Sequence, residues 1–184
     1  MSTLAERLES PARTAQLAPV ETLCFMGLAP GHVFCDIGAG TGLFAFAART
    51  ITDRVHALDV DDAMLEIMRE KAVEQNIDDI RITKTSASSL DMPEASCDAA
   101  MMCAVLHELG ETSPSLLAEA VRILKKGGIL GIIELRNVPV EPERPIGRRI
   151  TENDMIACAE GVGLKLIRTR QLGHLFYMQV YKNE

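Results

Sequence analysis

The sequence contains no tryptophan, and aromatic residues make up only 4% of its 184 positions. Its five cysteines form no C-x-x-C pair, so neither a zinc site nor a redox pair is indicated. Unpaired thiols persist in a reducing compartment, and we therefore expect a cytoplasmic protein. The chain also lacks an apolar run long enough to cross a bilayer and the apolar core of a secretory signal. We accordingly expect no metal site and no membrane span.

Positive charge is scarce as well. The chain has 19 Lys and Arg against 26 Asp and Glu, which gives a net charge of −7. Nucleic-acid binding needs Lys and Arg to neutralise phosphates, so we expect no nucleic-acid partner. The one tight basic cluster comprises Arg144, Arg148 and Arg149, and we interpret it as a solvated loop. A small molecule is the expected partner, and the oligomeric state stays open.

Apolar runs and helix signals alternate along the chain. Pro11 and Pro19 should each end a helix or occupy its first turn within the helical segment 2–28. Further helices are expected over 43–50, from Asp61 or Asp62, from Ser113 to a stop at Gly127 and Gly128, and from Thr151 to the glycines at 161 and 163. Strands are expected over 33–37, 55–60, 80–83, 98–106, 129–135, 164–172 and 175–181, with a loop over 137–149.

This alternation predicts an α/β fold. Right-handed crossovers place successive strands in parallel with helices on both faces of the sheet. The last two strands flank Gly173 closely and can form an antiparallel hairpin. We expect a Rossmann-like, doubly wound, mostly parallel seven-stranded sheet that ends in this hairpin. Ligands of such sheets bind at the carboxyl ends of the strands, so the loops after the first four strands should carry the chemistry.

The strongest local signal directly follows the first expected strand and reads Asp36-Ile37-Gly38-Ala39-Gly40-Thr41-Gly42. Glycines let the backbone turn sharply and let a ligand approach without meeting a Cβ. A dinucleotide-binding loop would read G-x-G-x-x-G, with its third glycine at position 43, which is Leu43. The spacing and the acidic Asp36, which would repel a pyrophosphate, disfavour a nicotinamide-dependent oxidoreductase.

A second acidic residue, Asp59, ends the second expected strand. A carboxylate at this place can accept two hydrogen bonds from a ribose diol. The alternative is a helix N-cap, but Asp61 and Asp62 are available for that position. We favour the ribose role.

At these motifs the sequence resembles the class I S-adenosylmethionine-dependent methyltransferases, most closely the quinone-biosynthesis-like C-methyltransferases. The resemblance also covers Lys125-Lys126-Gly127-Gly128 before the fifth strand. It implies that Asp36 engages the methionine ammonium of S-adenosylmethionine and that Asp59 engages the ribose. Family members often carry Asp-Ala where this chain has Ser86 and Ala87 beside the adenine. The complete implied cofactor site is Asp36, Gly38, Ala39, Gly40, Gly42, Asp59, Val60, Met64, Ser86, Ala87 and Cys103.

The resemblance implies one domain over 1–184, with 1–28 as a helical lid segment and 29–184 as the cofactor-binding core. Methyl transfer mainly requires that the acceptor is held in line with an activated methyl group. A base is needed only for an acceptor that must lose a proton, and His107 is the candidate, with Glu108 and Glu134 as weaker ones. A structural role for His107 and a cofactor-binding module without catalysis remain alternatives.

Overall fold

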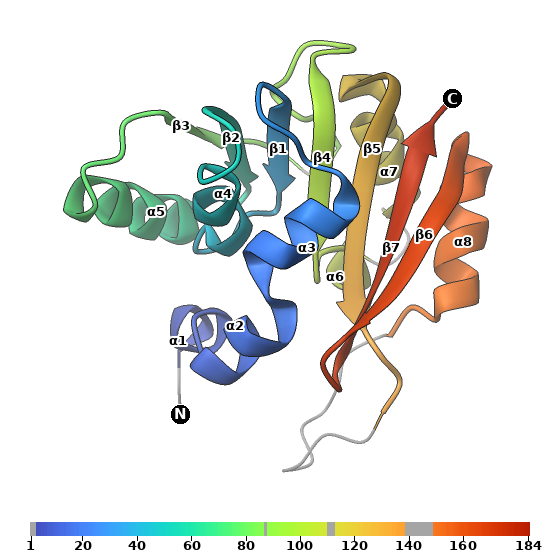
Figure 1. Ribbon diagram of the computed structural model, residues 1–184, viewed down its shortest axis with the longest axis horizontal. Coiled ribbons are helices and arrows are strands. Elements are labelled where there is room, and N and C mark those ends of the chain that lie inside the picture. Colours follow the sequence, from blue (N-terminus) through green and yellow to red (C-terminus); the bar gives the residue numbers. More distant parts are fainter. Residues whose placement is uncertain (1–2, 87, 110–112, 139–148) are drawn as a thin grey trace.

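The computed structural model describes residues 3–86, 88–109, 113–138 and 149–184. A seven-stranded sheet with the order β3-β2-β1-β4-β5-β7-β6 runs through the molecule (Figure 1). Its first five strands are parallel neighbours, and β7 is antiparallel to both β5 and β6. The predicted Rossmann-like sheet with a terminal hairpin is therefore confirmed. The strands are β1 (Val33–Ile37), β2 (Arg54–Asp59), β3 (Ile80–Lys84), β4 (Cys97–Cys103), β5 (Leu124–Leu135), β6 (Leu164–Leu172) and β7 (Phe176–Asn183).

Helices cover both faces of this sheet and bury two apolar clusters against it. One face carries α3 (Pro19–Met26), α4 (Leu43–Ala48) and α5 (Asp62–Glu74). The other face carries α7 (Ser113–Ile123) and α8 (Glu152–Gly161). The strands of the central sheet are apolar on both sides, because both sides are buried.

Two short helices, α1 (Leu4–Leu8) and α2 (Pro11–Leu17), precede α3. Pro11 and Pro19 both occupy the first helical turn, as the sequence predicts, because a missing N–H costs no hydrogen bond there. Ser10 accepts a hydrogen bond from the backbone of α2 and caps it. Figure 1 shows α1 and α2 beyond the carboxyl ends of the central strands, while α3 crosses a face of the sheet.

The fourth strand ends earlier than predicted. β4 stops at Cys103 rather than at residue 106, and Leu106–Leu109 forms the short helix α6. Ala104 breaks the strand with a positive φ of 59°. The buried carboxylate of Glu134, on the neighbouring strand, then accepts hydrogen bonds from the backbone N–H groups of Leu106 and His107. This carboxylate satisfies the free donors at the start of α6, which favours a helix there.

The end of α7 also differs from the prediction. The helix stops at Ile123, and the expected stop residues Gly127 and Gly128 lie inside β5. The last carbonyls of α7 accept hydrogen bonds from the backbone of Ala95 and Ser96, so this helix end needs no glycine cap. Gly128 is required for another reason, because a Cβ there would come within 2.8 Å of the Lys125 carbonyl and 3.2 Å of the Asp98 carbonyl on β4.

Smaller differences concern element ends. β2 begins and ends one residue before the predicted range, and β3 extends one residue further. Most of the predicted loop over 137–149 lies outside the described residues, and so do Arg144 and Arg148. Arg149, the third arginine of the basic cluster, donates a hydrogen bond to the carbonyl of Val138 at 3.0 Å. Within the described ranges, no helix has the length and apolar character needed to cross a bilayer.

Candidate functional site

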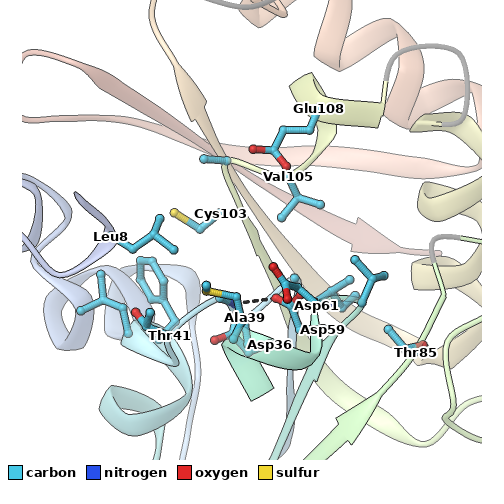
Figure 2. Close-up of a pocket in the computed structure, with 18 of the residues that line it drawn as sticks. Leu8, Asp36, Ala39, Thr41, Asp59, Asp61, Thr85, Cys103, Val105 and Glu108 are labelled. Carbon is cyan, nitrogen blue, oxygen red and sulfur yellow. Dashed lines mark hydrogen bonds between the residues drawn. The ribbon is translucent and has the colours of Figure 1, made fainter. Parts of the chain in front are cut away.

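A cavity of about 270 Å³ opens at the carboxyl ends of β1, β2 and β4 (Figure 2). This is the edge of the sheet where the fold places a ligand. Its wall combines segments that are far apart in the sequence. The main contributors are Leu4, Leu8, Arg13, Asp36, Gly38, Ala39, Gly40, Asp59, Val60, Met64, Thr85, Ser86, Cys103, Val105, Glu108 and Leu116.

The glycines of the loop between β1 and α4 have two different structural roles. Gly38 and Gly40 line the cavity. A Cβ on Gly38 would approach Val105 to 2.6 Å, so only glycine lets the loop pass under the segment after β4. Gly42 is absent from the cavity wall, and a Cβ there would meet the Phe46 ring at 2.7 Å. Gly42 thus lets the start of α4 pack closely, and its predicted cofactor contact stays a prediction.

Asp36 is a buried carboxylate that faces this cavity. Its side chain is 2% exposed, and Oδ2 accepts a hydrogen bond from the backbone of Ala45 at 2.9 Å. Burial is the main cause that raises the pKa of Asp36 to about 7. The hydrogen bond from Ala45 and the charge of Arg13 oppose this rise, whereas the Asp59 carboxylate adds to it. A cationic ligand beside Asp36 would stabilise its ionised form.

Asp59 holds two loops together as well as lining the cavity. Oδ2 accepts from the backbone of Gly40 at 2.7 Å, and Oδ1 accepts from the backbone of Asp61 at 2.9 Å. Asp61 itself caps α5 by accepting from Ala63 at 2.8 Å. Asp59 is therefore not the N-cap, and its carboxylate is held at the edge of the cavity by backbone donors.

Three of the residues predicted beside adenine contribute to the cavity wall. Val60 is 53% exposed and Met64 is buried, and both contribute to the wall. Ser86 also lines the wall, with its hydroxyl 3.3 Å from the carbonyl of Ser89 as a donor. That bond leaves the hydroxyl oxygen able to accept from a ligand. Ala87 lies outside the described residues.

Arg13 is a site residue that the sequence analysis missed. It reaches across from α2, where Nη1 donates to the Leu8 carbonyl at 2.9 Å and Nη2 to Cys103 Sγ at 3.5 Å. Its guanidinium also lies over the Phe176 ring. Among the described residues no carboxylate pairs with Arg13, although its charge acts on Asp36. The cavity therefore contains a cationic group close to an anionic one.

Cys103 lies beside that guanidinium. Burial raises the pKa of its thiol to about 12, against the effect of Arg13. The sulfur is therefore a neutral thiol at physiological pH rather than a nucleophilic thiolate.

His107 lies in α6, outside the cavity wall, whereas its neighbour Glu108 lines the cavity (Figure 2). His107 Nδ1 is 2.8 Å from Oε2 of the buried Glu134, and Nε2 is 4.0 Å from Glu108 Oε1. The hydrogen bond to Glu134 raises the pKa of His107 against the opposing effect of burial. The Glu134 carboxylate thus orients the imidazole of His107, and the Glu108 carboxylate lies near this ring and lines the cavity.

The N-terminal segment closes one side of the cavity. Leu4 and Leu8, which belong to the segment that the resemblance predicts as a lid, contribute apolar surface to the cavity wall. Glu9 forms an ion pair with Lys71 on α5, and Lys71 also donates to the Thr41 carbonyl at 3.0 Å. Lys71 therefore ties the first helices to the glycine loop.

Comparisons with known proteins agree with this geometry. A family described as a methyltransferase domain matches residues 35–132. The chain is 30% identical over 142 residues to a ubiquinone/menaquinone biosynthesis C-methyltransferase of Brucella anthropi. The match covers 75% of this chain and 51% of that protein, so the chain spans about half the length of this relative.

Solved structures share the fold. A S-adenosylmethionine-dependent methyltransferase from Aquifex aeolicus superposes with a TM-score of 0.87 at 22% identity, covering 98% of this chain and 97% of that one. The [4+2]-cyclase SpnF superposes with a TM-score of 0.75 at 19% identity, covering 89% and 80%. The same fold thus occurs in proteins named for different reactions, and the reaction must be argued from the site.

Proposed function

This chain belongs to the class I S-adenosylmethionine-dependent methyltransferases, and we propose that it transfers the methyl group of S-adenosylmethionine to a small acceptor with an apolar body. The observation that carries the proposal is a single cavity that joins the glycine loop, Asp36 and Asp59. When bound, the cofactor supplies a methyl group already activated on a sulfonium. The protein's task is then to hold the two reactants in line.

The charges in the cavity suit the amino-acid end of this cofactor. An α-amino acid carries an ammonium and a carboxylate, which require an anionic and a cationic partner. We propose Asp36 for the ammonium, because its Oδ2 already accepts from Ala45 and its other oxygen remains available. We propose Arg13 for the carboxylate, because it lines the same cavity without a carboxylate of its own.

The remaining contacts follow from the shape of the wall. Asp59 is proposed to accept from the ribose hydroxyls in addition to its backbone donors, since a carboxylate has about four acceptor positions. Val60 and Met64 offer apolar surface for the adenine, and Ser86 offers a hydroxyl at its edge. The backbone of residues 38–40 borders the methionine part, and Cys103 borders the reacting end.

The acceptor space is largely apolar. Leu4, Leu8, Val105 and Leu116 contribute to the wall, which supports an acceptor with a hydrocarbon or aromatic body. The relative in Brucella anthropi is named for ubiquinone and menaquinone biosynthesis, so hydroquinones are the first acceptors to test. We propose that residues 1–28 act as a lid over this space.

A net charge of −7 supports a small molecule rather than a nucleic acid as acceptor. The cytoplasm is the proposed compartment, supported by the five free thiols.

A base is proposed only for an acceptor that loses a proton. His107 remains the candidate through its pairing with Glu134, although it is Glu108 that faces the cavity. A proton accepted by Glu108 passes to His107 only once the 4.0 Å between Oε1 and Nε2 shortens to a hydrogen bond, and the raised pKa of His107 then favours holding it.

The experiment uses the purified protein, S-adenosylmethionine with a deuterated methyl group, and a panel of demethylated hydroquinones and phenols. Mass spectrometry should find one labelled product, and Asp36→Asn should lower its rate of formation. If the protein binds the cofactor but labels no member of the panel, the non-catalytic binding module becomes the better interpretation.

A further inference from the structure

A second cavity lies at the opposite end of β2 from the cofactor site. Its volume is about 320 Å³, and it is formed where β2 and β3 begin, beside residues 92–96. Arg54 and Asp59 are the first and last residues of β2. At about 3.3 Å per residue, the two cavities are therefore about 17 Å apart along the strand. A ligand here would not overlap the cofactor.

Three basic side chains gather in this second cavity, although the protein as a whole is acidic. Arg54 and His56 share one face of β2, because side chains alternate along a strand. Arg81 on β3 is the register partner of His56 and lines the same cavity. In the part of the chain that the structure describes, no carboxylate pairs with either arginine, and Arg54 donates only to the Gly31 carbonyl at 3.4 Å.

Two carboxylates belong to the same wall, and they cancel only part of this charge. Asp79 is paired with Arg49, whose Nε is 2.5 Å from Oδ1. Asp53 is exposed to solvent, as Arg54 and Arg81 are, so its charge offsets that of one of the two arginines. The cavity therefore keeps an excess of positive charge.

The pKa of the half-buried His56 imidazole reflects this excess of positive charge. Burial lowers the pKa of His56, and the charges of Arg81 and then Arg54 lower it further. Within the described ranges, the His56 ring has no hydrogen-bond partner. The ring thus has both nitrogens available in a positive environment.

We propose that this cavity binds a small phosphorylated compound, with Arg54, His56 and Arg81 around the phosphate. One guanidinium can donate two parallel hydrogen bonds to a phosphate, and this cavity offers two guanidinium groups on adjacent strands. The apolar side chains of Val33, Met92 and Pro93 would contact the rest of the ligand. The described residues between β3 and β4 (85–86 and 88–96) form no helix, and Arg54 and Arg81 are exposed while His56 is half-buried.

Inorganic pyrophosphate is the first probe, titrated into the whole protein at constant ionic strength while the His56 ring signals are followed by NMR. A His56→Gln spectrum assigns those signals. We expect a saturable shift and a rise in the pKa of His56, because a bound anion stabilises its protonated form. Arg81→Gln should weaken the affinity by about fivefold or more, since it removes a charge-assisted contact at a partly exposed site.

Arg69→Gln is the matched control, because Arg69 is an exposed arginine on α5 that pairs with Glu66. It should leave the affinity unchanged. Arg54→Gln provides a second variant if Arg81→Gln melts early. Saturating S-adenosylhomocysteine should not displace the probe. A shift that never saturates, an equal loss in Arg69→Gln, or displacement by S-adenosylhomocysteine would each overturn the proposal.

Discussion

Cofactor binding should depend on pH through Asp36. Its carboxyl has a pKa of about 7 in the free protein, whereas an ammonium ligand requires the ionised form. At about pH 6 only one carboxyl in roughly eleven is ionised, and at about pH 8 nearly all are. The affinity for S-adenosylhomocysteine should therefore rise about tenfold between these values, or about 1.4 kcal/mol, and then level off.

Calorimetry in buffers of different ionisation enthalpy measures both the affinity and the protons released. We expect close to one proton released at low pH and almost none at high pH. Asp36→Asn is the control, because the variant meets the same ligand without the titrating group. Its affinity should be low and nearly independent of pH.

The same substitution has an opposite effect on stability. The pKa of Asp36 is raised in the folded state from 3.8 to about 7, so its contribution to stability is complete below about pH 4 and declines as the pH rises through 7. Three pKa units correspond to about 4 kcal/mol at most. Asp36→Asn should thus melt higher than the wild type at about pH 8 while binding more weakly. An affinity that stays flat with pH, or a variant that both melts lower and binds normally, would refute this reasoning.

Three further predictions concern the neighbouring groups. Arg13→Met should weaken S-adenosylhomocysteine binding by about 1.5–3 kcal/mol but leave 5′-methylthioadenosine, which lacks the amino-acid end, unaffected in the same calorimetric assay. Asp59→Ala should weaken both ligands, because both keep the ribose, and should also lower the unfolding free energy by about 2–4 kcal/mol in urea melts through its two lost backbone bonds. His107→Ala should lose about 1–3 kcal/mol of stability at about pH 6 and less at about pH 9. The pKa of His107 is raised in the folded protein, so the stabilising pairing with Glu134 is complete below about pH 6.5 and is lost as the pH rises through the folded-state pKa. An equal loss of stability at both pH values would contradict this prediction.

The fold follows from local patterns to a large extent. β1 occupies the predicted range, Asp61 caps α5 as one of the two expected residues, and the last two strands form the predicted hairpin. These features depend on short-range signals, namely apolar runs, cap residues and turn glycines. A single sequence therefore contains enough information to predict them.

The errors come from contacts between distant residues. β4 ends at Cys103 because Glu134, on another strand, caps the following helix. Arg13 reaches Cys103 across 90 positions, and no local pattern marks it as a site residue. The register of β2 and β3 brings His56 beside Arg81, a pairing that only the sheet topology defines. The motifs predicted several residues that line the cavity, whereas Arg13 and the apolar wall residues Leu4 and Leu8 required the structure.

The cavity beside Asp36 and Asp59 is proposed to bind S-adenosylmethionine. Calorimetry of the purified wild-type protein with S-adenosylmethionine and, separately, with NAD tests it most directly. We expect one S-adenosylmethionine site of about micromolar affinity, about −8 kcal/mol, and no binding of NAD. Tight binding of NAD together with no binding of S-adenosylmethionine would contradict it.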